Sequence, residues 1–266
     1  MRRRFNTRLC ASRLTPGRAL LTALFLFLTS DSLARRACAQ DQGWSLTASA
    51  GYALLSLDEI DRDNNADVQG WNRLGVPVDA FESVRPSPFF AIGVRYRPSR
   101  EFAFSLTGFY NTKKVSTSYS SPATTLSMTR SVGSTDISLG IAYIPPAQLY
   151  FLKWYIQVDA TLVLARATAE AYATQLVKID GVPAIAPTVE TSARYKKSRL
   201  GVGLSVGADV PLSRLVFLRF EGRYRFAQFG TLDADVTRFG DRFTETSTIE
   251  FNYSGFLLGA GIGFTL

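Results

Sequence analysis

Apolar side chains occupy every second position over long stretches of this chain. At the C-terminus one face of the alternation carries only apolar residues: Phe256, Leu258, Ala260, Ile262, Phe264 and Leu266. A repeat of two residues is that of a β-strand with one apolar face. From residue 40 onward the chain has no run of 18 apolar residues, so no membrane-spanning helix is predicted there, and no extended helical repeat is found. The pattern predicts an all-β fold.

The alternation recurs in eight segments, separated by connections of two kinds. The predicted strands are 44–54, 90–96, 102–110, 137–143, 154–164, 200–210, 215–226 and 255–266. Long connections (56–88, 116–130, 171–192 and 231–248) alternate with short ones (98–100, 145–151 and 211–214). An even number of strands with short turns at one end and long loops at the other is typical of outer-membrane barrels. The sequence therefore predicts a closed antiparallel up-and-down transmembrane β-barrel of eight strands.

Aromatic residues fall near both ends of these predicted strands. One group lies toward the short turns (Trp44, Tyr96, Phe102, Tyr143, Trp154 and Phe264), and another toward the long loops (Tyr52, Tyr110, Tyr224 and Phe226). Amphipathic rings prefer the two membrane interfaces. Some segments, such as 193–210, exceed the 9 to 11 residues or so that a strand needs to cross a bilayer. These segments are expected to project past the membrane.

The N-terminal segment has the features of a secretory signal peptide. Several arginines precede an apolar stretch from Ala19 to Leu28, and Ala37-Cys38-Ala39 supplies the small residues of a cleavage site. We expect cleavage after Ala39, with cleavage after Ala34 as the alternative. This divides the chain into a signal peptide (1–39) and a barrel domain (40–266).

Removal of the signal peptide changes what the composition implies. The segment 1–39 holds eight arginines and one aspartate, so the formal net charge falls from +8 to +1. Both cysteines, Cys10 and Cys38, leave with it, so the mature chain can form neither a disulfide nor a thiolate metal site. The basic balance therefore gives no reason to expect nucleic acid as a partner.

The C-terminal segment carries a resemblance to a known class of signal. The tail from Gly259 to Leu266 resembles the β-signal by which outer-membrane barrels are recognised by the barrel assembly machinery, with Gly261, Phe264 and Leu266 at the matching positions. It departs from that pattern in having Gly259 in place of a polar residue and Leu in place of a final Phe. The strand count and loop pattern resemble the small barrels of the outer membrane protein A and X type. The resemblance implies a bacterial outer-membrane location.

Catalytic and metal-binding chemistry is not predicted. Small outer-membrane barrels that are enzymes resemble one another in relying on a histidine, and this chain has none. Without His or mature Cys there is no usual base for an activated nucleophile. In the first loop, Asp61-x-Asp63-x-Asn65 resembles the start of a calcium loop, but Ala66 replaces the required Gly and Asn72 the bidentate Glu. We expect a solvated acidic loop, with weak divalent-cation contact to lipopolysaccharide as the alternative, and neither enzyme activity, metal nor cofactor.

Charged residues on the opposite face of several strands are expected to point into the lumen. They are Arg95, Arg97, Asp136, Asp159, Asp209, Arg219, Glu221, Arg223 and Arg225. An eight-stranded barrel is just wide enough for its side chains to fill it, so the sequence predicts a paired structural network. The alternative is a gate in a narrow conducting path, with Glu221 and Asp159 as the counter-ions of Arg219 and Arg223.

These predictions combine into a non-enzymatic integral outer-membrane barrel with a structural or surface-interaction role. Loops carry function on rigid scaffolds, so 56–88, 171–192 and 231–248 are the expected contact surfaces for an extracellular ligand. The other expected partners are outer-membrane lipid, lipopolysaccharide and, during biogenesis, the barrel assembly machinery. A narrow channel for small solutes or ions is the first alternative. A soluble exported β-barrel that binds an apolar ligand is the second, and it would need the apolar faces to point inward.

Overall fold

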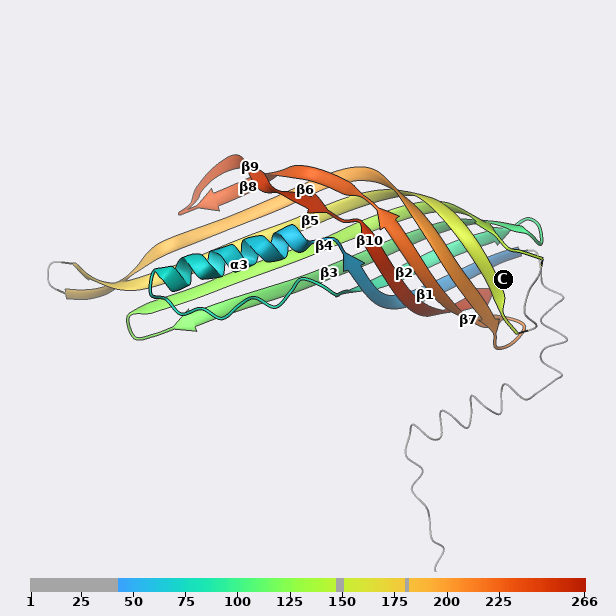
Figure 1. Ribbon diagram of the computed structural model, residues 1–266, viewed down its shortest axis with the longest axis horizontal. Helices are drawn as coiled ribbons and strands as arrows, with labels where there is room; N and C mark the ends of the chain where they lie inside the picture. Colours follow the sequence, from blue (N-terminus) through green and yellow to red (C-terminus); the bar gives the residue numbers. More distant parts are fainter. Residues whose placement is uncertain (1–42, 147–150, 180–181) are drawn as a thin grey trace, which may run out of the picture.

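The computed structural model describes residues 43–146, 151–179 and 182–266, which form ten strands and one helix (Figure 1). The predicted signal peptide, 1–39, lies outside the described residues. The elements are β1 (Gly43–Leu55), α3 (Asp58–Arg73), β2 (Ser87–Arg97), β3 (Phe102–Ser120), β4 (Thr124–Tyr143), β5 (Lys153–Ile179), β6 (Val182–Pro211), β7 (Val216–Phe226), β8 (Gln228–Arg238), β9 (Asp241–Asn252) and β10 (Gly255–Thr265).

Eight of the strands form a closed antiparallel ring. The order is β1-β2-β3-β4-β5-β6-β7-β10, and β10 returns to β1 with an unbroken register from Ser45 opposite Thr265 to Leu55 opposite Gly255. Each of the eight predicted strand segments corresponds to one strand of this ring, with only Leu215 and Leu266 lying one residue outside β7 and β10. The prediction of a closed eight-stranded up-and-down barrel is therefore confirmed.

The prediction that the long connections are loops was wrong. Residues 116–130 and 171–192 are mostly strand, because β3–β4 and β5–β6 continue as hairpins well past the ring. Residues 231–248 contain most of a third hairpin, β8–β9, whose β8 pairs with β6 from Thr191 to Tyr195. In Figure 1 the long strands β3 to β6 extend far beyond the ring on one side. We call this side the cap end, and the side of the short connections the turn end.

The first long connection contains α3, a helix that the sequence did not predict. Its first turn holds Asp58, Glu59 and Asp61, which suit the positive end of the helix dipole. Gly75, with φ +81°, follows directly after the last turn and ends the helix in a left-handed conformation. The buried stripe is Ile60, Asn64 and Val68. The asparagine in the middle of this stripe interrupts the apolar repeat, so the helical period was not visible.

α3 packs on the inner side of the extended strands β3 to β6 (Figure 1). Its Asp67 forms an ion pair with Arg130 of β4, and Asn64 accepts a hydrogen bond from the Arg130 Nε at 3.3 Å. Glu59 accepts from the backbone N of Glu250 in β9 at 2.9 Å. Among the described residues no helix has the length and apolarity needed to cross a bilayer.

Around the ring the outward side chains are apolar, whereas the inward ones are mostly polar, with a few buried apolar residues such as Phe109 among them. Ile92, Leu139 and Val158 are 71%, 64% and 60% exposed, although each lies in the middle of a strand. The inward positions of the same strands include Ser105, Ser138, Gln157 and Thr161, all of them buried. The exterior of the ring is thus an unbroken apolar belt.

At the cap end this arrangement reverses. Outward positions of β3 to β5 become polar and exposed (Thr112, Lys114, Ser116, Ser118, Ser127, Arg166 and Glu170). Inward positions become apolar and buried (Val115, Leu126, Met128, Val132, Ala165, Ala167 and Ala173), and they join Ile60 and Val68 of α3 in one core. The change occurs near Tyr110, Thr135, Leu164 and Ser198, which are successive partners across β3, β4, β5 and β6. We call the described parts of 56–86, 111–135, 165–199 and 227–254 the cap.

Candidate functional site

Three places in the molecule carry charged groups that need an explanation: the lumen of the ring, a cavity at its turn end, and the surfaces of the cap. The lumen contains the charges that the sequence singled out. Arg95, Asp136, Asp159, Arg219, Arg223 and Arg225 are buried, and Arg97, Asp209 and Glu221 are partly buried.

The level nearest the turn end is built on Asp209. Arg219, opposite it on β7, donates from Nε to Oδ1 at 2.7 Å and from Nη2 to Oδ2 at 2.9 Å. Arg95, from β2 across the lumen, lies 3.4 Å from the Asp209 Oδ2 and donates to Gln157 Oε1 at 3.1 Å. One carboxylate thus serves two arginines.

Tyr155 lies beside this level, between Arg95 and Arg219. Its ring lies under the Arg95 guanidinium at 4.0 Å, an arrangement typical of a cation–π contact. Its hydroxyl donates to Glu221 Oε2 at 2.6 Å. Glu221 is not the direct ion-pair partner of Arg219 that the gate alternative expected: Arg219 forms its ion pair with Asp209, while Glu221 accepts from the Tyr155 hydroxyl and attracts Arg219 only at longer range.

The middle level centres on Asp159 and Arg223, whose charged atoms lie 3.5 Å apart. Asp159 also accepts from Gln157 Nε2 at 2.6 Å, and Arg223 donates to Ser138 Oγ and Thr161 Oγ1, both at 2.7 Å. The predicted pairing of Asp159 with an arginine is present. Gly203 leaves room for it, because a Cβ there would lie 2.9 Å from the Arg223 Nε.

The level nearest the cap pairs Arg225 with Asp136. Arg225 also donates to the backbone oxygen of Tyr253 at 2.9 Å and to Ser134 Oγ at 3.2 Å. The arginine side chain is 1% exposed and the aspartate 3%. Because Tyr253 belongs to the connection between β9 and β10, this level ties the lumen to the cap.

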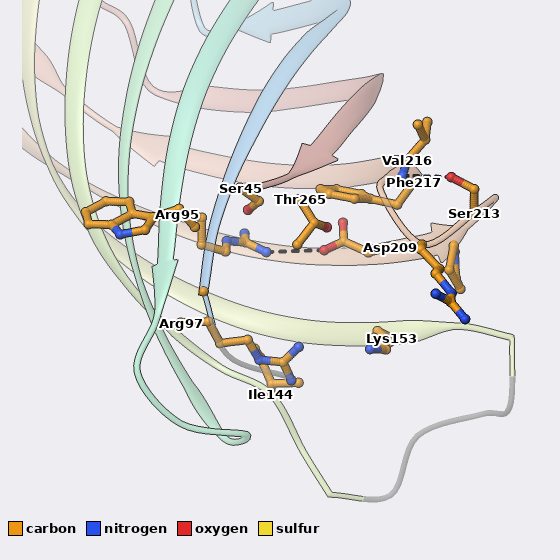
Figure 2. Close-up of a pocket in the computed structure, with 14 residues that line it drawn as sticks. Ser45, Arg95, Arg97, Ile144, Lys153, Asp209, Ser213, Val216, Phe217 and Thr265 are labelled. Atoms are coloured by element: carbon orange, nitrogen blue, oxygen red, sulfur yellow. Dashed lines mark hydrogen bonds and ion pairs between the residues drawn. The ribbon is translucent and has the colours of Figure 1, made fainter. Parts of the chain in front are cut away.

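A cavity of about 90 Å³ opens at the turn end (Figure 2). The Arg95–Asp209 pair lies against it, and Arg97, Lys153 and Ser45 line its sides. Arg97 donates to the backbone oxygen of Arg100 at 2.7 Å and so belongs to the mouth rather than to the three levels. Beyond this cavity the buried side chains of the three levels project into the lumen.

The cap holds a groove of about 350 Å³ between α3, β4 to β6 and the β8–β9 hairpin. Its floor is made of small and apolar residues, including Ala169, Ala171 and Ala193. Asp63, Asp67 and Trp71 of α3 form one wall, with Arg130 and Tyr195 nearby. Asp67 is paired with Arg130, whereas Asp63 accepts no hydrogen bond from a described residue.

Burial changes the ionisation of Asp63. Its pKa is raised above the usual value, first by burial and then by the neighbouring Asp67 carboxylate, while Arg130 acts in the opposite direction. Burial likewise raises the pKa of Tyr195 on the other side of the groove. The groove therefore contains a carboxylate whose charge is only partly compensated.

The acidic residues predicted to lie in a solvated loop are instead on α3. Asp61 accepts from Ser83 Oγ at 2.6 Å and from the Val84 backbone N at 3.0 Å, and so fixes the segment that follows the helix. Asp58 forms an ion pair with Arg85. Among the described residues no cluster of three or more potential metal ligands is found.

The residues matched to the β-signal lie in β10 and directly after it. Phe264 is exposed on the outer face, and the Leu266 backbone N donates to the Trp44 oxygen at 2.9 Å. Gly261 faces Ser49 at the seam with β1, where an added Cβ would lie 2.3 Å from the Ala48 oxygen. Recognition by the assembly machinery stays a prediction.

Sequence reasoning missed the neutral polar residues that complete the lumen. Gln157, Ser138, Thr161 and Tyr155 all contact the predicted charges, and each occupies an inward position of a predicted strand. Their position was a usable signal, because polar residues at alternate sites opposite an apolar face point to the same interior.

Comparison with known proteins gives likenesses of overall architecture. No protein-family model and no curated protein sequence matches the chain. Among solved structures, Neisserial surface protein A is 15% identical, with a TM-score of 0.40 over 84% of this chain and 97% of that one. A major outer membrane protein from Thermus thermophilus is 11% identical (TM-score 0.47; 84% and 100% of the chains), and the attachment invasion locus protein of Yersinia pestis is 12% identical (TM-score 0.35; 84% and 99%). Likenesses at this level do not indicate a function.

Proposed function

We propose that the chain is an integral barrel of a bacterial outer membrane that holds a folded cap outside the bilayer for contact with an extracellular partner. The reversal of sidedness in β3 to β6 carries this proposal. Apolar side chains that face outward are stable in lipid, and polar side chains that face outward are stable in water. A strand whose outward side chains change from apolar to polar along its length therefore passes from lipid into water.

The exterior of the ring supports a position within the membrane. Aromatic pairs lie on its outer face toward the turn end: the rings of Trp44 and Tyr96 are 4.7 Å apart, and those of Phe102 and Tyr143 are 5.6 Å apart. Tyr224 and Phe256 form another exposed pair toward the cap, 4.9 Å apart. Aromatic girdles at two levels with an apolar belt between them are typical of the two membrane interfaces. The soluble alternative requires apolar faces that point inward, opposite to the arrangement of the ring.

A structural lumen and an interacting cap together favour the surface role over conduction. The three levels of paired charges fill the ring, and the cap core lies over its outer end. The groove of the cap is a concave surface that lies beyond the membrane belt. The floor of the groove consists of small and apolar side chains, and the negative charge of Asp63 is only partly compensated. These features favour a ligand with an apolar body and a cationic group.

An enzymatic role is not part of this proposal. The chain holds no histidine, and its cysteines are at positions 10 and 38. We expect purified barrel to show no hydrolase activity on peptide, ester or phospholipid substrates. Hydrolase activity of the purified barrel would contradict this expectation, including activity that does not depend on the acidic residues of the groove.

Membrane placement can be tested with single cysteines in a Cys10→Ser/Cys38→Ser background. Leu139→Cys lies in the belt, Ser116→Cys on the outer face of the cap, and Val115→Cys, its neighbour, in the cap core. On intact cells a membrane-impermeant maleimide should label only Ser116→Cys, and a lipid-soluble maleimide should also label Leu139→Cys. Labelling of Leu139→Cys by the impermeant reagent, or recovery of the chain in the soluble fraction, would overturn the proposal.

The channel alternative is decided by conductance. In a planar bilayer we expect no stable unitary conductance from the purified barrel, because the side chains of the three levels fill the lumen. A conductance that shifts on Glu221→Gln would establish the channel instead.

A further inference from the structure

Three cations gather on the outer face of β5 and β6 directly beyond the apolar belt. This basic cluster consists of Arg166, Arg194 and Lys196, all exposed, whereas Lys197 and Arg199 occupy the alternate positions of β6 that face the other side of the sheet. Leu200, the next residue of β6, is 76% exposed and begins the outward apolar row. On β5, Arg166 follows two residues after Leu164, where the belt ends. The cluster therefore lies within a few residues of the boundary between lipid and water.

Two members of the cluster are opposed in the sheet. Arg166 and Lys196 are direct register partners on β5 and β6, and both point outward. Like charges directly opposite each other in a sheet are destabilising. No member of the cluster forms an ion pair with a described residue. The repulsion is thus left for a bound anion to relieve.

A cavity of about 500 Å³ adjoins the cluster. Arg194 and Lys196 line it together with Arg242 of β9 and the hydroxyl-bearing Ser192, Thr237 and Thr244. Asp235 also lines it and is the register partner of Arg194, so the surface includes one carboxylate. Guanidinium, ammonium and hydroxyl groups together suit a ligand with both phosphate and sugar oxygens.

We propose that the basic cluster binds the phosphate groups of a phosphorylated glycolipid in the outer leaflet, the class to which lipid A belongs. This inference rests on the proposed membrane position, because that position places the cations at the depth of the headgroups. At about 3.4 Å per residue, Arg166 and Lys196 lie roughly 7 and 14 Å along their strands from the last outward apolar residues, and less than that in depth because barrel strands tilt. Juxtamembrane cations at such depths attract anionic headgroups.

The test measures binding of lipid A to the purified, folded full-length barrel in detergent by native mass spectrometry. Bisphosphorylated lipid A should bind the parent protein, and Arg166→Gln/Lys196→Gln should weaken binding about 10- to 30-fold, since each cation near a membrane surface contributes about 1 kcal/mol. The matched control is Arg62→Gln/Arg73→Gln, which removes two exposed arginines from α3 and should leave binding unchanged. If the first variant does not fold, Arg194→Gln/Lys196→Gln, which removes the two cluster cations that line the cavity, replaces it with the same expectation.

Two further ligands in the same binding experiment distinguish a lipid phosphate from free phosphate. Dephosphorylated lipid A should bind like the cluster variants, and inorganic phosphate should not compete at equal concentration. Full competition by inorganic phosphate would overturn the lipid assignment, and equal binding by parent and cluster variants would overturn the site. If the single-cysteine labelling places the ring in the membrane while lipid A binding is independent of the cluster, the inference fails and the membrane proposal stands. If the impermeant maleimide labels Leu139→Cys or the chain is recovered in the soluble fraction, the membrane proposal fails as well.

Discussion

Asp209 and Arg219 face each other on neighbouring strands, β6 and β7, and share two hydrogen bonds of 2.7 and 2.9 Å. The same carboxylate lies 3.4 Å from Arg95, which reaches it from the opposite wall of the lumen. Two buried cations therefore depend on one anion. This makes Asp209 the residue that holds the turn end of the lumen together.

Asp209→Asn should destabilise the barrel by about 3 to 5 kcal/mol, because it leaves buried arginines without their carboxylate. The matched control is Glu221→Gln, another replacement of a carboxylate by an amide in the same lumen. Glu221 accepts from the Tyr155 hydroxyl, and an amide oxygen can also accept, so the cost should be at most about 1.5 kcal/mol. Urea unfolding in lipid vesicles, followed by tryptophan fluorescence, measures both. Equal destabilisation by the two variants would contradict this assignment of roles.

The partners of the lumen charges show what a sequence can and cannot predict. Their inward direction follows from strand periodicity, which needs only local sequence. Which arginine meets which carboxylate depends on the register between strands. Arg95 and Asp209 are 114 residues apart and meet only because β2 and β6 lie across one lumen. For this reason Glu221 was assigned the wrong partner.

The cap was mispredicted although its signal is present in the sequence. In β4 the apolar residues change from even positions, Leu126 and Met128, to odd positions, Ile137 and Leu139. A change of phase within one strand keeps the period of two but exchanges the faces. Because this change of phase was interpreted as the end of the alternation, the predicted strands ended too early and the hairpins were predicted as loops. The eight ring strands were unaffected, because each keeps one phase throughout the belt.

The packing of Tyr155 gives a second test of the lumen. A Cβ at Gly207 would lie 2.3 Å from the Tyr155 ring, which Arg95 and Arg219 flank at 4.0 and 5.3 Å. Gly207→Ala should therefore displace the ring and destabilise the barrel by about 1 to 3 kcal/mol. Gly222→Ala is the control, because a Cβ there meets its nearest neighbour, a Leu258 methyl, at 3.4 Å. If both alanines unfold in urea at the parent midpoint, the tight contact at Tyr155 is not real.

Two aspartates of α3 should respond to substitution with opposite signs. Burial and the nearby Asp67 raise the pKa of Asp63, so the folded cap binds this proton more tightly than the unfolded chain. A raised acid pKa means that the group favours folding at low pH and disfavours it as pH rises through the folded pKa. At pH 7, Asp63→Asn should therefore protect the cap from trypsin in outer-membrane vesicles, and the protection should fade as pH falls toward 3.8, the ordinary pKa. Asp61 accepts two hydrogen bonds from the segment after the helix, so Asp61→Asn should speed cleavage instead. Faster cleavage of Asp63→Asn than of the parent at pH 7 would show that the Asp63 carboxylate is stabilised in the folded cap, contrary to its surroundings.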